Sequence, residues 1–486
     1  MKKNKYLILF LLLFSTTFYS CDKDYFDINR DPNSPAEVSE DLLLTATLAN
    51  FSYEVVGGYP PRVTNLWTKH LADATPPPHV GTYDIDENDV NNFWTYTSYT
   101  HVMNNSKKLS ELALANENPQ YSAIAKIVWA WNMTYITDLF GDVPFSQAWK
   151  GEEGNFKPTY DSQEDVYKAI QNLLDEAIVE ANQPAGLKVP GADDLVYGGK
   201  MANWIKLANS LKARAYLRLS YAPGYDAAEQ ADKALAALNA GAISSNAEMP
   251  TFKYANQPGA ENPWYQYAID GKWGTFTRPS VFYLDLLQSK NDPRIAYQAT
   301  VATTGTDIGK YVGATNDGGN PGTAGSAIGP FYSAADAPVY MFIYAEIPFI
   351  RAEAEFLKAG KMITPEVIDA YNKGIQASMS MYGISAAEIT AYQLANALNV
   401  LDPEAAYDQI MTQKYIANYL QVEPYNDYRR TGYPVLPLNE EAVIDRIPLR
   451  FPVPSGERLY NPTNVPSNLP AGYASLLVPV WWDTTL

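Results

Sequence analysis

Residues 124–145 read IAKIVWAWNMTYITDLFGDVPF, and this stretch carries the strongest structural signal in the chain. Five of its apolar side chains are spaced so that they share one face of an α-helix: Ile124, Ile127, Val128, Trp131 and Tyr135. Gly141 follows between two aspartates, at a place where a helix commonly ends on a residue with left-handed backbone angles. The stretch therefore predicts a packed helix that ends in a defined turn at Gly141.

Helical spacing of apolar residues recurs along the rest of the chain. It is found at 166–178, 205–215, 228–238, 349–356, 367–379 and 404–420. Ser162 precedes the first of these stretches and, with Asp165 three residues on, predicts a helix cap. Strand-like alternation is scarce. Helix pairs of about 34 to 45 residues suit a tetratricopeptide-like stack. We predict a mainly α fold, a tetratricopeptide-like helical scaffold that carries large irregular, loop-rich lobes near 57–98, 244–338 and 423–486.

Composition narrows the class of protein. The 486 residues include 36 Lys and Arg against 54 Asp and Glu, a net charge of −18. A nucleic-acid-binding protein needs a basic face, and no cluster of Lys and Arg in the sequence could form one. Tyrosine is abundant, and its apolar ring and polar tip suit both protein cores and ligand contacts. The composition indicates a globular, acidic protein and argues against nucleic acid as a partner.

The first twenty residues have the layout of a secretory signal peptide. Lys2, Lys3 and Lys5 precede an apolar run at 6–14, and a short polar stretch follows. Nine apolar residues are too few for a helix that spans a bilayer, which needs about 20. We predict a signal peptide at residues 1–20, and no transmembrane helix in the mature chain.

Cys21 is the only cysteine and stands where bacterial lipoproteins carry their lipid. We expect it to be lipidated; the alternative is an exported protein with a free thiol. Asp22-Lys23-Asp24 resembles the surface-export signal of Bacteroidetes lipoproteins, and Pro- and Asn-rich residues follow. We therefore predict a lipidated tether at 21–35, before a single domain at 36–486.

Sequence patterns for metal, cofactor or catalytic sites are weak. The three histidines lack the spacing of a helical zinc site, and a single cysteine excludes a thiolate zinc site. Asp84, Asp86 and Asn88 begin like a calcium loop, but Asp89 and Thr95 stand where an EF-hand needs Gly and Glu. We predict no metal, no cofactor and no catalytic residue. Glycoside hydrolysis by a pair of carboxylates stays an open alternative, because the sequence alone does not give the distance between two carboxylates.

Aromatic residues in the loop-rich stretches are the candidate ligand contacts. An aromatic ring stacks on the apolar face of a sugar, and nearby amides and carboxylates can bind the sugar hydroxyls. For any single residue of this kind, packing of a lobe onto the helices is the more common role. The predicted ligand-binding residues are Trp67, Tyr83, Trp94, Tyr96, Trp264, Tyr267, Trp273 and Tyr332.

A series of motifs along the whole chain resembles the SusD/RagB family of outer-membrane lipoproteins. Asp138-Leu139-Phe140-Gly141-Asp142-Val143-Pro144-Phe145 is similar to the most recognisable of them. The others lie, in order, at 29–33, 158–167, 204–214, 291–294, 344–354, 413–415, 428–434 and 447–451. Within this series, Arg429 and Arg430 are expected to pair with carboxylates such as Glu346 or Glu353 and so to bind lobe to scaffold.

The resemblance implies a function as well as a fold. It implies a non-enzymatic, lipid-anchored protein at the cell surface, with a ligand-binding lobe. It also implies a partner, the SusC-like TonB-dependent outer-membrane transporter to which such proteins deliver nutrient. Members of the family bind mostly oligosaccharides, and some bind peptides. We therefore expect a glycan-binding protein, with a peptide-binding protein of the same type or a glycoside hydrolase as the alternatives.

Overall fold

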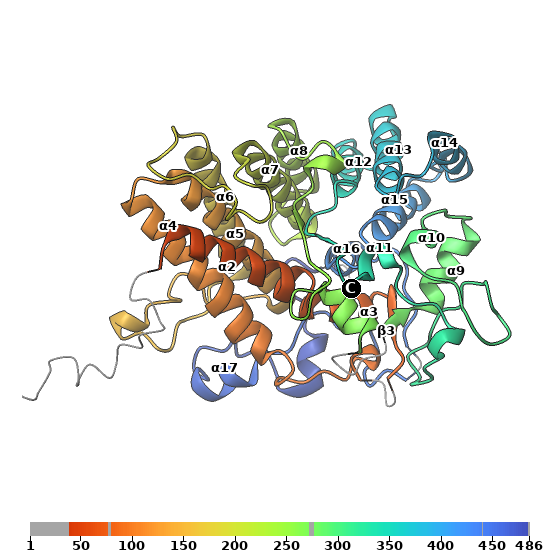
Figure 1. The fold of residues 1–486 in the computed structure, drawn as a ribbon, viewed down its shortest axis with the longest axis horizontal. Helices are drawn as coiled ribbons and strands as arrows, with labels where there is room; N and C mark the ends of the chain where they lie inside the picture. The colour runs from red at the N-terminus through yellow and green to blue at the C-terminus, as the bar shows by residue number, and fades with distance from the viewer. Residues whose placement is uncertain (1–37, 76–78, 272–276, 440, 485–486) are drawn as a thin grey trace, which may run out of the picture.

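The computed structural model describes residues 38–75, 79–271, 277–439 and 441–484. The scaffold is a row of helices in which each packs on the next along the chain (Figure 1). The row comprises α4 (Asn105–Ala115), α5 (Pro119–Phe140), α6 (Gln163–Ala181), α7 (Met201–Arg218), α8 (Ala227–Asn239), α12 (Glu346–Lys358), α13 (Pro365–Ser380) and α15 (Pro403–Ala417). Two more helices lie beside it, with α2 (Glu40–Asn50) on α4 and α14 (Ala386–Ala395) on α13. The seven stretches with helical spacing fall in this row, although the last helix ends at Ala417 rather than at residue 420, so the predicted helical scaffold is confirmed.

Smaller elements form the lobes, which lie together on the lower side of Figure 1. Their helices are α3 (Tyr59–Trp67), α9 (Val281–Ser289), α10 (Ile295–Gln298), α11 (Pro330–Ser333), α16 (Glu423–Thr431) and α17 (Ser455–Tyr460). Their strands form two antiparallel pairs, β1 (Leu71–Asp73) with β3 (Thr277–Pro279) and β2 (Thr251–Phe252) with β4 (Val339–Tyr340). Three π-helical segments, Phe51–Val56, Phe93–Asn104 and Tyr265–Ile269, complete them.

The three loop-rich stretches meet one another. The pairing of β1 with β3 joins the first stretch to the second. Backbone and side-chain bonds from Val443 N to Thr82 O (3.0 Å) and from Asn439 Nδ2 to Gly81 O (3.0 Å) join the first to the third. The first stretch is also more regular than predicted. Two of its prolines, Pro60 and Pro61, stand in the first turn of α3, where the backbone N–H groups that proline lacks would have no partner within the helix.

Two local predictions at helix ends are confirmed. Ser162 caps α6, and its side chain accepts a hydrogen bond from the backbone N–H of Asp165. Gly141 ends α5 with a positive φ of +80°, as predicted, but its ψ of −124° lies outside the left-handed helical region. A Cβ at Gly141 would lie 3.3 Å from the guanidinium nitrogens of Arg450, so the turn at this glycine is also closely packed.

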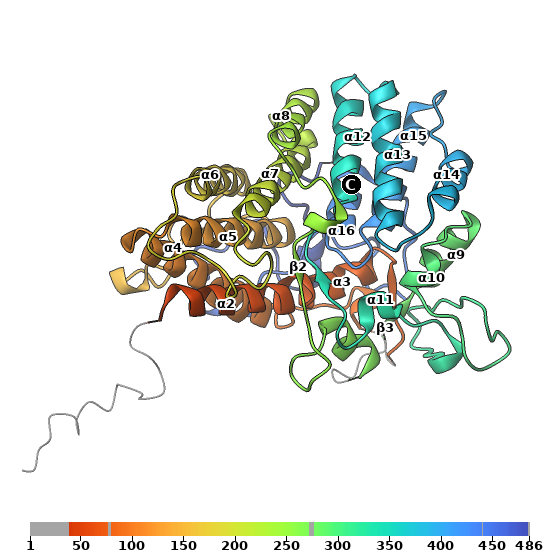
Figure 2. The ribbon, with the colours of Figure 1, turned by 45° about the horizontal axis from the view of Figure 1, so that its top comes forward.

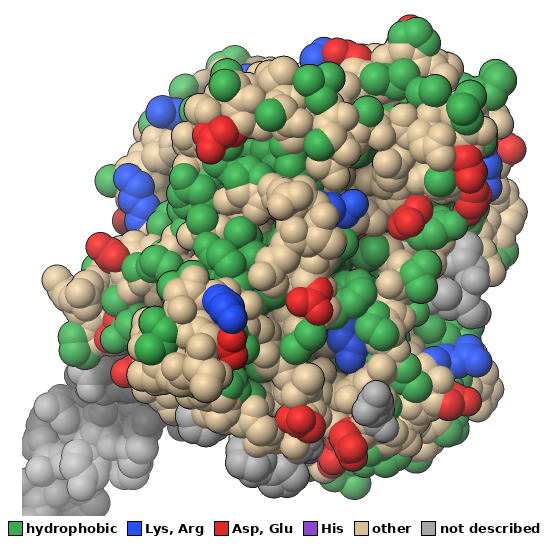
Figure 3. Space-filling view, turned by 90° about the vertical axis from the view of Figure 1, so that its right-hand side faces the viewer, with side chains coloured by type: hydrophobic (Ala, Val, Ile, Leu, Met, Phe, Trp, Pro, Cys, Tyr) green, Lys and Arg blue, Asp and Glu red, His purple; other side chains and the backbone are tan. Residues whose placement is uncertain are grey.

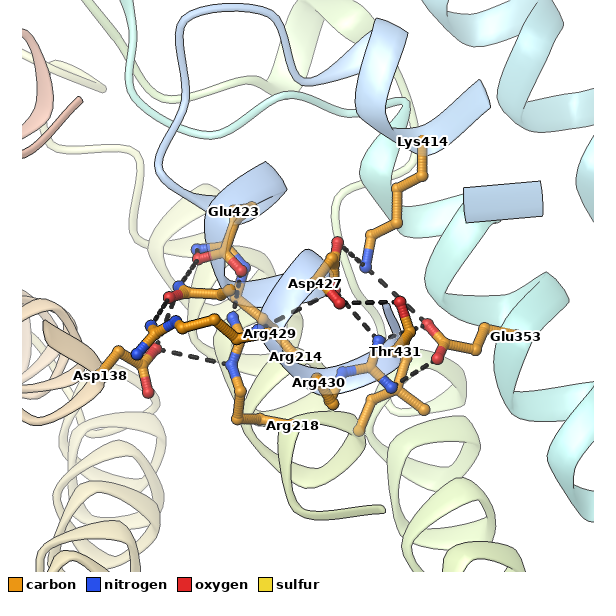
Figure 4. A network of polar contacts seen from close by, with 12 residues as sticks. Asp138, Arg214, Arg218, Glu353, Lys414, Glu423, Asp427, Arg429, Arg430 and Thr431 are labelled. Atoms are coloured by element: carbon orange, nitrogen blue, oxygen red, sulfur yellow. Dashed lines mark hydrogen bonds and ion pairs between the residues drawn. The ribbon is translucent and has the colours of Figure 1, made fainter. Parts of the chain in front are cut away.

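A network of buried charges fastens α16, the first helix of the third lobe, to the scaffold (Figure 4). Arg430 on α16 donates to Glu353 on α12 at 2.5 and 2.8 Å and to Asp427 at 3.0 Å. Asp427 also lies 2.8 Å from Nζ of Lys414 on α15. Burial alone would raise the pKa of Asp427, but the charges of Lys414 and Arg430 hold it well below its usual range. The aspartate is therefore ionised and bound to two cations.

This network corrects one detail of the predicted pairing. Arg430 pairs with Glu353 as expected, whereas the guanidinium of Arg429 donates to the carbonyl of Leu449 (2.8 Å) and to Asn426 Oδ1 (2.6 Å). Glu346 is bound instead by Arg214 of α7, at 2.6 and 2.8 Å. Consecutive residues of a helix point about 100° apart, so Arg429 and Arg430 cannot both face α12.

The predicted signal peptide and tether, Cys21 included, lie outside the described residues. Among the helices that the structure describes, none combines the length and the apolar composition needed to cross a membrane. On the face that carries α9 and α14, Lys and Arg side chains stand singly rather than as a patch (Figure 3).

Candidate functional site

Two of the predicted ligand contacts, Trp67 and Tyr83, lie in the interior. The Trp67 ring is fully buried and packs edge to face on Tyr425 and Phe451, with ring centroids 5.4 and 5.3 Å apart. Its Nε1 donates to the carbonyl of Val80 (3.1 Å). Tyr83 is equally buried. In the described conformation the Trp67 ring packs the first lobe against the third.

The candidates of the second loop-rich stretch are also packed. Trp264 and Tyr267 are nearly buried and meet edge to face at 6.0 Å. The Tyr332 hydroxyl shares a 2.5 Å hydrogen bond with that of Tyr382. Trp273 lies outside the described residues. A lobe that wraps a helical scaffold needs a core of its own, and the large rings supply it.

Trp94 and Tyr96 differ from the others because Trp94 lines a surface hollow and Tyr96, which is not among its lining residues, is exposed nearby in the chain. Both belong to the π-helical segment Phe93–Asn104, and such segments are frequent at functional sites. Tyr96 is 59% exposed. Trp94 is buried on most sides but lines a hollow of about 590 Å³. This volume is within the range of small-molecule binding sites.

The floor of this hollow, here called the Trp94 pocket, is aromatic. Trp94 and Tyr99 lie 4.9 Å apart between ring centroids, and Tyr99 and Trp149 lie 5.6 Å apart. The Tyr99 hydroxyl donates to the carbonyl of Pro144 (2.7 Å), and Trp149 Nε1 donates to the carbonyl of Tyr99 (3.0 Å). Trp129 supports Trp149 edge to face at 5.4 Å. Because both polar tips are bonded to backbone, the half-buried rings of Tyr99 and Trp149 are held in place.

The rim of the Trp94 pocket is polar and mixed in charge. It carries Asn104, Lys107, Lys108, Glu111, Glu152 and Glu457. Lys107 pairs with Glu111 at 2.5 Å. Glu457 comes from α17 of the third lobe and accepts hydrogen bonds at Oε2 from the Tyr160 hydroxyl (2.9 Å) and Asn461 Nδ2 (3.1 Å). Burial and the charge of Glu457 raise the pKa of Tyr160, so its hydroxyl keeps its proton and donates to the carboxylate.

The geometry fits binding better than catalysis. Two of the three rim carboxylates, Glu111 and Glu457, are already held by protein partners. Within the described part of the chain, no group of three or more His, Cys, Asp or Glu side chains is placed to hold a metal ion. Fixed rings with amide, ammonium and carboxylate groups around them can stack on a sugar and bind its hydroxyls.

Of the sequence-predicted residues, Trp94 alone lines the Trp94 pocket, and the sequence prediction did not include Trp149 or the supporting ring of Trp129. Trp149 follows the motif at 138–145, outside the stretches that looked loop-rich. Trp149 has a positive φ of 57°, which turns the chain at this residue, and no residue pattern in the sequence predicts that turn. The local signal that could have pointed to it is a tryptophan in the long connection between α5 and α6, at residues 141–162.

Comparison with known proteins gives one family. A family model described as "Starch-binding associating with outer membrane" matches residues 32–454. A structure described as a chitin-binding protein is 25% identical, with 92% of this chain and 100% of that chain covered and a TM-score of 0.77. A SusD homolog from Bacteroides uniformis is also 25% identical (91% and 99% covered, TM-score 0.75).

A chitin-binding SusD homolog from Flavobacterium johnsoniae is 23% identical, with 91% of this chain and 99% of that chain covered and a TM-score of 0.73. No match was found among curated proteins. The predicted tetratricopeptide-like fold is thus shared with solved structures over nearly their whole length.

Proposed function

Because the chain belongs to the SusD-like family of outer-membrane glycan-binding proteins, we propose that it captures an oligosaccharide in the Trp94 pocket and delivers it to a SusC-like TonB-dependent transporter. The family consists of binding proteins rather than enzymes, and it associates with the outer membrane. The observation that carries the proposal is the fixed aromatic floor of Trp94, Tyr99 and Trp149 beneath a polar rim.

The domain organisation follows from the same proposal. Residues 1–20 direct export, residues 21–35 form a tether lipidated at Cys21, and residues 36–486 form the binding domain. A multi-chain lipid anchors stably where a single chain would bind only marginally. The anchor holds the binding domain at the cell surface, beside the transporter.

The mixed rim points to a neutral glycan. Lys107 and Lys108 stand beside Glu111, Glu152 and Glu457, so the pocket has no excess of positive charge for a uronic or sulfated sugar. One 25% identical structure is described as chitin-binding. Oligomers of β-1,4-linked N-acetylglucosamine are therefore the first ligands to test, followed by α-1,4-linked glucose.

The test is a binding screen of the soluble chain from residue 22, against glycans and against peptides as controls. Trp149→Ala should weaken binding about tenfold or more, because a central aromatic contact is worth about 2 kcal/mol and 1.4 kcal/mol is tenfold. Tyr216→Ala, at another half-buried aromatic on α7, serves as the control and should bind as the unaltered chain does. Equal affinity in the Trp149 variant would refute the pocket assignment, and binding to peptides alone would refute the glycan.

A further inference from the structure

We propose that a second hollow, between the end of α2 and the segment that follows β2, is an independent binding site for one or two neutral pyranose rings. It has a volume of about 420 Å³ and is lined by Asn50, Tyr53, Phe252, Lys253, Tyr254 and small residues. Figure 2 shows the loop after β2 beside the last turn of α2. This hollow, here called the Tyr254 pocket, shares no lining residue with the Trp94 pocket.

Two half-buried tyrosine rings form its walls. The Tyr53 and Tyr254 centroids lie 6.4 Å apart at 47°, and Phe252 supports Tyr254 at 5.1 Å. The Tyr53 hydroxyl donates to Gln266 Oε1 (2.6 Å), and the Tyr254 hydroxyl shares a hydrogen bond with Ser52 Oγ (3.0 Å). Since each hydroxyl already has a protein partner, each ring offers a ligand its apolar face. Two inclined ring faces can hold a pyranose by its C–H groups.

The remaining wall groups select an uncharged ligand. Asn50 donates with Nδ2 to the carbonyl of Ala46 (2.9 Å), which leaves its side-chain oxygen as an acceptor for a sugar hydroxyl. Lys253 is the single charged side chain among the lining residues, and it is exposed to solvent. With no carboxylate in the wall, the pocket offers no ion pair to an amine or a basic peptide.

The rim of the Tyr254 pocket is held in advance of binding. Ala255 N donates to the carbonyl of Ala260 (2.9 Å), which closes the loop. Gly259 N donates to Glu261 Oε2 (2.8 Å), and the same oxygen accepts from Gln266 Nε2 (3.1 Å). Gln266 in turn binds the Tyr53 hydroxyl, so a chain of hydrogen bonds runs from rim to wall. A pocket ordered before binding loses little entropy when a ligand enters.

The experiment is a calorimetric titration of the soluble chain from residue 22 with the β-1,4-N-acetylglucosamine tetramer, cellotetraose and maltotetraose. We expect at least one of them to bind at two sites. Tyr254→Ala should remove one site, and Trp149→Ala the other. Tyr254→Phe keeps the ring face and should keep both sites. Ala260→Trp fills the hollow from an exposed position and should act like Tyr254→Ala, which guards against a variant that fails to fold.

The outcomes separate this inference from the proposed function. If Tyr254→Ala and Ala260→Trp leave both stoichiometry and affinity unchanged, the inference is overturned. The same holds if Trp149→Ala alone abolishes all binding, or if none of the three oligosaccharides binds. If binding survives Trp149→Ala and is lost in the two Tyr254-pocket variants, the inference stands and the Trp94 pocket loses its assigned role.

Discussion

Replacing Arg430 by Met should destabilise the protein by several kcal/mol without touching either pocket. Arg430 is 1% exposed and donates to both oxygens of Glu353, at 2.5 and 2.8 Å, and to Asp427 at 3.0 Å. Methionine has a similar length and no charge. It leaves Glu353, which is fully buried, with the Tyr407 hydroxyl at 2.7 Å and Lys414 Nζ at 3.9 Å. Removing one partner of a buried ion pair costs about 3–5 kcal/mol.

Urea unfolding followed by circular dichroism measures this loss. The double variant Arg430→Met/Glu353→Gln should recover part of it, because the glutamine is neutral and still accepts from Tyr407. Arg351→Met on α12 is the matched control. Its ion pair with Glu355 is long (3.9 Å) and partly exposed, so its effect should stay within about 1 kcal/mol. A loss at Arg430 no larger than that of the control would refute the role of the network. Glycan affinity of the folded variant should not change.

Three further predictions concern stability and anchoring. Burial lowers the pKa of His70 to about 3, against about 6.5 in an unfolded chain. Between these two pH values the unfolded state binds one more proton than the folded state. The free energy of unfolding should therefore fall by about 1.4 kcal/mol per pH unit as the pH drops from 6.5 toward 3. His70→Gln should flatten that slope in urea titrations, and an unchanged slope would contradict it. Gly141→Ala should cost about 1–3 kcal/mol in the same assay, because an L side chain is strained at a φ of +80°; a neutral effect would mean that the turn relaxes. Cys21→Ser should move the exported protein from the membrane fraction to the soluble fraction on immunoblots, and retention in the membrane would exclude lipidation as the anchor.

The helices could be predicted because their burial repeats with the helical period. On α6, for example, Val166, Ile170, Leu174 and Ala177 are all buried, and the intervening positions other than Tyr167 are exposed or half-buried. The π-helical segments could not be predicted in this way. A π-helix has about one more residue per turn than an α-helix, but this difference does not change the aromatic and polar composition of the segment. The segment Phe93–Asn104 also continues directly into α4.

The sequence did not predict which aromatic side chains are buried. Trp67 and Trp149 have the same side chain, yet the first is enclosed by Tyr425 and Phe451 and the second lines an open pocket. The difference lies in partners that are remote in the chain. Tyr425 is on α16, more than 350 residues from Trp67. A single sequence does not predict that the third lobe packs against the first. The sequence thus placed the aromatic candidates in the loop-rich stretches but did not show which of them face solvent.

The same long-range folding links the buried charges to the Trp94 pocket. The pocket takes Trp94 and Tyr99 from one segment, Trp149 from a second and Glu457 from the third lobe. That lobe is attached at α16 by the Arg430 network, and beside the pocket by the bond from Asn461 Nδ2 to the carbonyl of Pro158 (2.9 Å). Because the attachment is buried and the pocket rim is exposed, rim residues can change without loss of the interactions that place the lobe. If the Trp94 pocket binds a glycan as proposed, substitutions at its rim should change the glycan preference while the charged interior stays the same.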